Sequence, residues 1–359
     1  MKKKKVMIFL PYMPGYGGIE TVVKNLLEEY DHYQGNDCEL RVVCIGGYGD
    51  GNWISNIKDK TVIQLSQNKN IRTVEYATIF PGVLLYEVLK YKPDVVVSTS
   101  SKLWSTLYFW RNLFHLKYKV ASWRHSSLLY YPSSDLALRM ADIFLSISTG
   151  IGKQLQEKGV SKDKIRVIYN PVKEGKYSIP RTSKSDPVKF VFVGRLMLGG
   201  QKNMKEMLDG FSQVHGNWSL DIYGKGTTEQ KLELQNYINK LGIQDHINFA
   251  GFKKDLWGTV GSADAVIMTS VFEGLPMALL EAVSNGVPVI SSDCATGPDD
   301  IVNSSNGYLY QPGNIKELGE ILQNFIDRKD TFEDVNSVKH SIDKFYSENY
   351  FSEFLKSLY

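Results

Sequence analysis

Short apolar runs alternate with amphipathic stretches along the whole chain, and this alternation limits the folds available to it. Runs rich in Val and Ile, with little polar alternation, occupy residues 5–11, 40–47, 61–66, 94–100, 119–125, 142–148 and 165–171. Such strands are typical of parallel sheets that are covered on both faces. Between the first two runs, Val22, Val23, Leu26 and Leu27 recur at helical spacing. The pattern predicts an α/β fold built on parallel sheets.

The strand series then starts again, with apolar runs at residues 189–196, 219–226, 246–252, 264–271 and 287–293. Residues 171–187 are rich in Pro, Ser and Lys and show no periodicity, which indicates a linker. We therefore predict two doubly wound, Rossmann-like domains, residues 1–170 and 188–335, that face a cleft. Residues 336–359 are predicted to form a C-terminal helix that crosses back to the first domain.

Positive charge is concentrated in the first half of the chain. The net charge is +3, but residues 1–170 carry eight more basic than acidic residues, and residues 171–359 five more acidic than basic ones. This asymmetry predicts that the first half meets an anionic surface or acceptor. The weak overall charge and the lack of a recognisable module argue against a nucleic-acid partner.

Residues 107–119 mix aromatic side chains with Arg111, Lys117 and Lys119. A helix of this composition either lies on an anionic membrane surface and collects a lipid-linked acceptor, or packs its aromatics into the core. No run reaches the roughly 18 apolar residues that a spanning helix needs. Three cysteines without metal-like spacing indicate a reducing compartment. We expect a cytoplasmic protein, peripheral on the inner face of the cell membrane under the first alternative.

Two cations follow the first strand of the second series. Arg195 and Lys202 lie at the end of that strand and just beyond it, where they suit a diphosphate, unless they are ordinary loop residues. In the first half, Gly17 and Gly18 open a helix and would let the backbone approach a phosphate, although a plain turn is an equal alternative. The glycine spacing is not G-x-G-x-x-G, which argues against a dinucleotide cofactor.

The stretch "VFEGLPMALLEA" places Glu273 before a predicted helix and Glu281 inside it. The two carboxyl groups do not share one helical face, so nothing requires them to act as a paired acid and base. Amides near Gly274 and Leu275 are positioned to hold anionic or hydroxyl groups of a ligand. The alternative is a surface acid followed by an acid that the helix dipole stabilises.

Four motifs in order, "GGIE", "VGRL" with a following lysine, "YGKG" and the E-x7-E of "FEGLPMALLEA", resemble family 4 glycosyltransferases over essentially the whole chain. The resemblance implies a retaining enzyme of the GT-B fold. The stretch "FEGLPMALLEA…GVPVISSDCATGPDDIV" is especially similar to bacterial lipopolysaccharide and capsule hexosyltransferases. We therefore expect transfer of a hexose from UDP-galactose, UDP-glucose or UDP-N-acetylglucosamine to a glycan or lipid-linked acceptor.

The resemblance implies a role for each matching residue. Arg195 and Lys202 would neutralise the leaving diphosphate, and Glu281 would bind the ribose. Glu273, with the amides of Gly274 and Leu275, would hold the donor sugar.

Other matching positions border the donor in the same family. Gly17 and Gly18 would approach the phosphates, while the turn at Gly224, Lys225 and Gly226 and the backbone near Phe252 would border the uracil. His125 would reach the 6-hydroxyl of the donor; the family's usual Asp after it is Ser126 here. Gly297 would shape the loop above the sugar, and Asp299 or Asp300 stands where the family has a glutamate.

The implied chemistry needs charge stabilisation rather than a nucleophile. No D-x-D motif occurs, so a metal bound by that motif is not indicated, and we expect no cofactor. Front-face attack, with the leaving phosphate taking the proton, is the mechanism that the resemblance implies. Two alternatives remain: a sugar-nucleotide 2-epimerase and a catalytically silent partner subunit that binds glycan or a sister enzyme.

Overall fold

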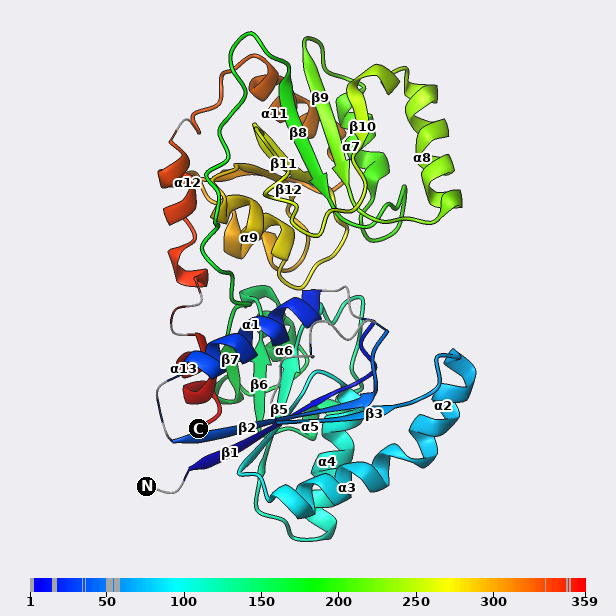
Figure 1. Cartoon of the computed structure of the whole chain (residues 1–359), viewed down its shortest axis with the longest axis vertical. Coiled ribbons are helices and arrows are strands. Elements are labelled where there is room, and N and C mark those ends of the chain that lie inside the picture. Colours follow the sequence, from blue (N-terminus) through cyan, green and yellow to red (C-terminus); the bar gives the residue numbers. More distant parts are fainter. Residues whose placement is uncertain are drawn as a thin grey trace. The chain divides into compact units, whose positions relative to one another are not determined.

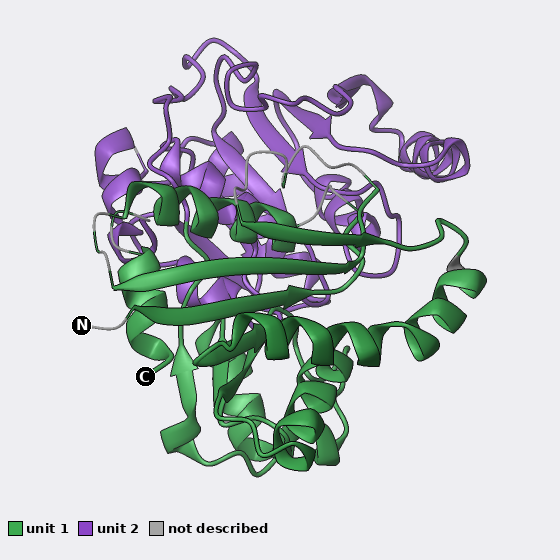
Figure 2. Ribbon diagram, turned by 60° about the horizontal axis from the view of Figure 1, so that its bottom comes forward, with its two compact units in different colours: residues 1–171, 347–359 green, residues 172–346 purple. Residues whose placement is uncertain are grey.

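The computed structural model describes residues 3–14, 18–33, 35, 37–49, 54, 59–332, 334–346, 348 and 350–359. The chain divides into two compact units (Figure 2). Unit 1 comprises Met1–Pro171 together with Ser347–Tyr359, and unit 2 comprises Val172–Tyr346. No helix among the described residues is both long enough and apolar enough to span a bilayer.

Unit 1 is built on a seven-stranded parallel sheet in the order β3-β2-β1-β4-β5-β6-β7 (Figure 1). Its strands are β1 (Lys4–Leu10), β2 (Cys38–Gly46), β3 (Lys60–Gln64), β4 (Val95–Ser98), β5 (Lys119–Arg124), β6 (Ile143–Ser146) and β7 (Ile165–Val167). Its helices are α1 (Gly18–His32), α2 (Lys69–Thr78), α3 (Phe80–Tyr91), α4 (Ser101–Leu113), α5 (Asp135–Arg139), α6 (Thr149–Glu157) and α13 (Tyr350–Ser357). Helices α3 and α4 cover one face and α1 and α13 the other (Figure 1), which explains why residues 6–10 of β1 are fully buried.

Unit 2 repeats this architecture with a six-stranded sheet in the order β10-β9-β8-β11-β12-β13. Its strands are β8 (Val188–Val193), β9 (Trp218–Tyr223), β10 (Ile247–Phe249), β11 (Ala265–Met268), β12 (Val289–Ser292) and β13 (Gly307–Tyr310). Its helices are α7 (Met204–Phe211), α8 (Thr228–Leu241), α9 (Met277–Ser284), α10 (Pro298–Ile301), α11 (Ile315–Ile326) and α12 (Val335–His340). Every strand pairing in both sheets is parallel.

The predicted fold class is confirmed, and every predicted apolar run contains a strand. The edge strand β13 was not predicted. The segment taken as a linker lies within unit 2, where the Ile179 amide donates to the Asn285 carbonyl at 2.9 Å. At the other end of the chain, α12 belongs to unit 2, whereas α13 belongs to unit 1 and packs Phe354 against Trp123, with ring centroids 5.4 Å apart.

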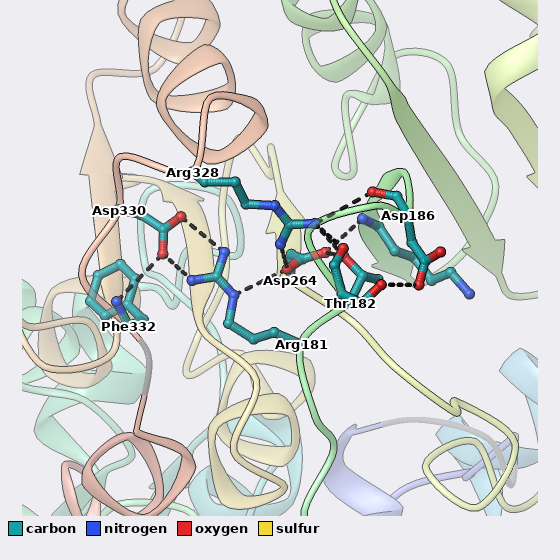
Figure 3. Close-up of polar contacts among 9 residues, drawn as sticks. Arg181, Thr182, Asp186, Asp264, Arg328, Asp330 and Phe332 are labelled. Carbon is teal, nitrogen blue, oxygen red and sulfur yellow. Dashed lines mark hydrogen bonds and ion pairs between the residues drawn. The ribbon is translucent and has the colours of Figure 1, made fainter.

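An ion network at the amino end of β11 holds the segment around Arg181 to the body of unit 2 (Figure 3). Asp264, which is fully buried, accepts from Arg181 Nε at 3.0 Å and from Arg328 Nη1 at 2.7 Å. Asp330 binds the other side of the Arg181 guanidinium in a bidentate pair. Both part-buried arginines of this network therefore meet a carboxylate, and the aperiodic segment is a fixed part of the unit.

Candidate functional site

The predicted donor-site residues of unit 2 gather at the carboxyl ends of adjacent strands. β8 lies between β9 and β11, so the loops that follow these three strands emerge at the same edge of the sheet. The loop after β8 carries Arg195 and Lys202, the turn after β9 spans residues 224–226, and the loop after β11 carries Glu273. This edge is where open parallel sheets bind ligands.

The turns after β8 and β9 approach each other so closely that one requires glycine. A Cβ added to Gly224 would lie 1.7 Å from the Gly194 carbonyl oxygen. Gly194 N donates to Tyr223 O at 3.0 Å, and Leu196 N donates to Lys225 O at 2.9 Å. These bonds fix the backbone on both sides of Arg195.

The two predicted phosphate-binding cations have different surroundings. Lys202 Nζ lies 2.7 Å from Glu273 Oε1, in a pair whose side chains are only 15% and 11% exposed. Arg195 is exposed, and its guanidinium donates to Gln201 Oε1 at 2.5 Å. Gln201 in turn donates to the Phe272 carbonyl at 3.2 Å, so it links the loop after β8 to the loop after β11. Sequence reasoning identified both cations but missed Gln201 and the ion pair.

Helix α9 begins after Pro276, which occupies the cap position without a side-chain capping bond. The first amides of a helix have no partner within it, so they are suited to a ligand oxygen. Within α9, burial raises the pKa of the Glu281 carboxyl from 4.5 to about 6, and the Trp257 indole N–H partly opposes this shift. A hydrogen-bond donor such as a hydroxyl would favour the charged form of this carboxyl.

A third loop meets the start of α9. Gly297 has a φ of +97°, and a Cβ there would lie 2.7 Å from the Gly274 carbonyl and 2.9 Å from Leu275 Cα. Thr296 donates its hydroxyl to the Glu273 carbonyl. Glycine is needed here both for the left-handed backbone and for the close approach. Of the two aspartates that follow, Asp300 is buried and Asp299 is exposed.

The remaining predicted donor contacts form a small platform beyond β9 and β10. Lys225 Nζ lies 4.1 Å from the ring centroid of Phe252, and this ring is 50% exposed. A cation over an exposed aromatic face leaves a flat surface on which a base can lie.

Two predicted residues belong to unit 1, and a third falls outside the described residues. Gly18 is the first residue of α1, whereas Gly17 lies outside the described part of the chain. His125 directly follows β5, and its Nε2 is buried with no hydrogen-bond partner in the part of the chain that the structure describes. Burial, together with the neighbouring Arg124, lowers the pKa of the imidazole to about 3, so the ring is neutral at neutral pH.

Known families and proteins match nearly the whole chain. Residues 16–175 match the family model described as Glycosyltransferase Family 4, and residues 176–339 the one described as Glycosyl transferases group 1. The chain is 33% identical over 349 residues to the lipopolysaccharide 1,6-galactosyltransferase of Escherichia coli (strain K12), covering 95% of this chain and 94% of that protein. The Salmonella typhimurium protein of the same description is 31% identical over 353 residues and 96% of each chain.

Solved structures show the same similarity. The apo form of the lipopolysaccharide outer core galactosyltransferase WaaB matches with a TM-score of 0.83 and 29% identity over 98% of each chain. Anabaena Alr3699/HepE in complex with UDP-glucose matches with a TM-score of 0.75 over 98% of this chain and 99% of that one. Its identity is only 18%, so this second likeness concerns the fold alone.

Proposed function

Because the chain belongs to the family 4 glycosyltransferases of GT-B fold, we propose that it transfers a hexose from a nucleotide sugar to a glycan or lipid-linked acceptor in cell-surface polysaccharide synthesis. The observation that carries this proposal is the set of loops at the carboxyl edge of unit 2. There the same loop carries the exposed Arg195 and the part-buried Lys202, which pairs with Glu273 shortly before the start of α9. This arrangement suits a leaving diphosphate and a hydroxyl-rich sugar.

Each group of this edge has a part in the proposed reaction. Arg195 grips the diphosphate, because its guanidinium is exposed and, among the described residues, donates to Gln201 alone. Lys202 adds a second positive charge, which Glu273 positions while offering its own oxygens to sugar hydroxyls. Glu281 accepts hydrogen bonds from the ribose hydroxyls, and these bonds offset the free-energy cost of burying its charged carboxylate.

We propose a UDP-linked hexose as the donor, with UDP-galactose tested first. The similar proteins of Escherichia coli and Salmonella typhimurium are described as galactosyltransferases, and the fold neighbour from Anabaena was solved with UDP-glucose. The platform of Lys225 and Phe252 would border the uracil. We further propose that the enzyme retains the anomeric configuration and that Arg195 and Lys202 supply the positive charge without a metal or another cofactor.

The acceptor is proposed to be collected by unit 1, whose residues supply the basic half of the sequence. Helix α4 packs one apolar side chain into the core and exposes two others: Leu107 is fully buried, while Phe109 and Leu113 are 52% and 53% exposed. It therefore has features of both a core helix and a membrane-surface helix. The adjacent α3 exposes Tyr86 and Leu89. We propose that these four exposed side chains, with nearby lysines, lie on the anionic inner face of the cell membrane of a cytoplasmic protein.

The experiment that tests this function measures turnover of UDP-galactose, UDP-glucose and UDP-N-acetylglucosamine, with and without acceptor. Arg195→Ala should lower transfer by about a hundredfold, as loss of one transition-state donor does elsewhere. Lys316→Ala is the matched control, because this lysine is 86% exposed on α11 and should leave transfer unchanged.

The same assay separates the alternatives. Conversion of UDP-N-acetylglucosamine without acceptor would indicate a 2-epimerase, and no turnover of any donor would indicate a silent partner subunit. Unchanged transfer in Arg195→Ala would overturn the diphosphate assignment. The proposed membrane surface is tested by sedimentation with liposomes. Binding should require anionic lipid and should fall in the double variant Phe109→Ser/Leu113→Ser. Binding that changes neither with the anionic lipid nor with these substitutions would contradict the membrane surface.

A further inference from the structure

Unit 1 has a pocket at the carboxyl ends of β4 and β5. Its lining includes Thr99, Ser100 and Ser101 after β4, and Arg124 and His125 at the end of β5, with Tyr131 at its rim. These two strands are adjacent and parallel, so both sets of residues emerge at one edge. Among the described residues that line the pocket, none is an acid.

Arg124 is a buried cation that no carboxylate of the described residues balances. Its side chain is at the pocket although the residue is only 8% exposed. Its guanidinium donates to the Ser126 carbonyl at 3.1 Å, to Ser133 Oγ at 3.0 Å and to the Tyr131 carbonyl. Three of the five N–H groups are thus used, all by neutral acceptors, and no described residue forms an ion pair with it.

Other polar atoms at this edge are also buried without partners. Thr99 Oγ1 and His125 Nε2 are inaccessible and make no hydrogen bond with any described residue. Helix α4 starts at the same place, and the Ser100 side chain makes no capping bond to it. Buried polar atoms are normally hydrogen-bonded, so two unpartnered atoms beside one unbalanced charge indicate that this edge is suited to a polar ligand.

We propose that this pocket binds an oxyanion, a phosphate or a carboxylate, that is carried by the acceptor. An oxyanion would receive hydrogen bonds from Arg124 and from the hydroxyl of Thr99, and would neutralise the buried charge. The assignment to the acceptor rests on the proposed function, under which the donor diphosphate is held by Arg195 and Lys202 of unit 2. The exposed ring of Tyr131, 54% accessible, could then lie along an adjoining sugar.

Anion binding can be measured without turnover. The full chain, labelled with 15N-histidine, is titrated with inorganic phosphate, and the imidazole signal of His125 is assigned through His125→Gln. We expect this signal to shift saturably with phosphate and not with potassium chloride at equal ionic strength. In Arg124→Gln the apparent phosphate affinity should fall by about tenfold or more, as expected for loss of a charged hydrogen-bond partner.

Two further variants keep the result interpretable. Arg111→Gln, the matched control, removes an arginine of unit 1 that is 16% exposed but paired with Asp142, and it should leave the phosphate response intact. Thr99→Val removes an orphan hydroxyl without touching the bonds of Arg124, and it should weaken phosphate binding by roughly threefold to tenfold. If Arg124→Gln does not fold, Thr99→Val decides. A phosphate response that is unchanged in the folded variants, or equal with chloride, overturns the site.

The source of the anion is settled by kinetics. Arg124→Gln should raise KM for a phosphorylated or carboxylated glycan acceptor by about tenfold and leave KM for the UDP-sugar unchanged. A rise in KM for the donor alone would overturn the assignment to the acceptor. If no donor is turned over, the proposed function fails, while the histidine titration still reports whether the pocket takes an anion.

Discussion

Replacing Glu281 with glutamine should stabilise unit 2 while weakening nucleotide binding. Burial raises the pKa of this carboxyl from 4.5 to about 6. At about 1.36 kcal/mol per pKa unit, the charged form costs the folded state about 2 kcal/mol at neutral pH. Glutamine has nearly the same shape and carries no charge, so it should remove most of that cost.

The sign of the pH dependence follows from the direction of the shift. The pKa is higher in the folded state, so the folded protein takes up the proton first as the pH falls. The destabilisation is complete above pH 6 and fades as the pH falls through 6 toward 4.5. At pH 5 only about 0.8 kcal/mol of it should remain.

Differential scanning calorimetry at pH 7.5 and pH 5 tests this reasoning. For a unit of this size, about 2 kcal/mol corresponds to an increase in Tm of roughly 4–8 °C at pH 7.5. The increase should shrink by more than half at pH 5, while titration with UDP should show affinity about tenfold weaker than in the unchanged protein. Glu320→Gln, at a glutamate that is 65% exposed, is the control and should change neither quantity. A lower Tm in Glu281→Gln at pH 7.5, or an increase that persists at pH 5, would refute the argument.

Four other substitutions test the framework and the charged site of unit 2. Asp264→Ala removes the buried carboxylate that pairs with the part-buried Arg181 and Arg328, so it should destabilise the unit by about 3–5 kcal/mol, measured as an earlier calorimetric transition. A change below about 1 kcal/mol contradicts a structural role. Gly224→Ala places a methyl group 1.7 Å from a backbone oxygen and should lower both Tm and UDP affinity; normal affinity would show that the two turns can separate. Lys202→Gln should reduce kcat by about a hundredfold. In the double variant Lys202→Gln/Glu273→Gln, kcat should fall by less than the product of the two single effects, because the two side chains are in contact. Fully additive effects would contradict this contact.

The fold was predictable from the sequence because buried parallel strands have a strong local signature. β13 (Gly307–Tyr310) was not predicted because it lies at the edge of the sheet and its middle positions are only half-buried, which weakens the apolar pattern. The contacts of the segment around Arg181 could not be predicted for a different reason. Aperiodic composition suggests a linker, but this stretch is fixed by ion pairs with Asp264 and Asp330, which lie 83 and 149 residues away.

The site was predictable only in its parts. The motifs identified Lys202 and Glu273 separately, yet they are 71 residues apart, and their contact depends on β8 lying beside β11. Arg124 was overlooked although it precedes His125, because a sequence cannot show that a charge is buried without a counter-ion.

The arginines of these two clusters indicate how ligand-binding charge can be separated from structural charge. At the amino end of β11, Arg181 and Arg328 face Asp264 and Asp330, so the formal charge of that cluster is zero and nothing further is required (Figure 3). At the carboxyl end of β5, Arg124 is solvated by carbonyl and hydroxyl dipoles, which bind the guanidinium but leave its full charge in place. Burial lowers the pKa of this guanidinium to about 10, which still leaves it charged at neutral pH. A folded protein that keeps such a charge at the ligand-binding edge of a parallel sheet gains from any anion that reaches it.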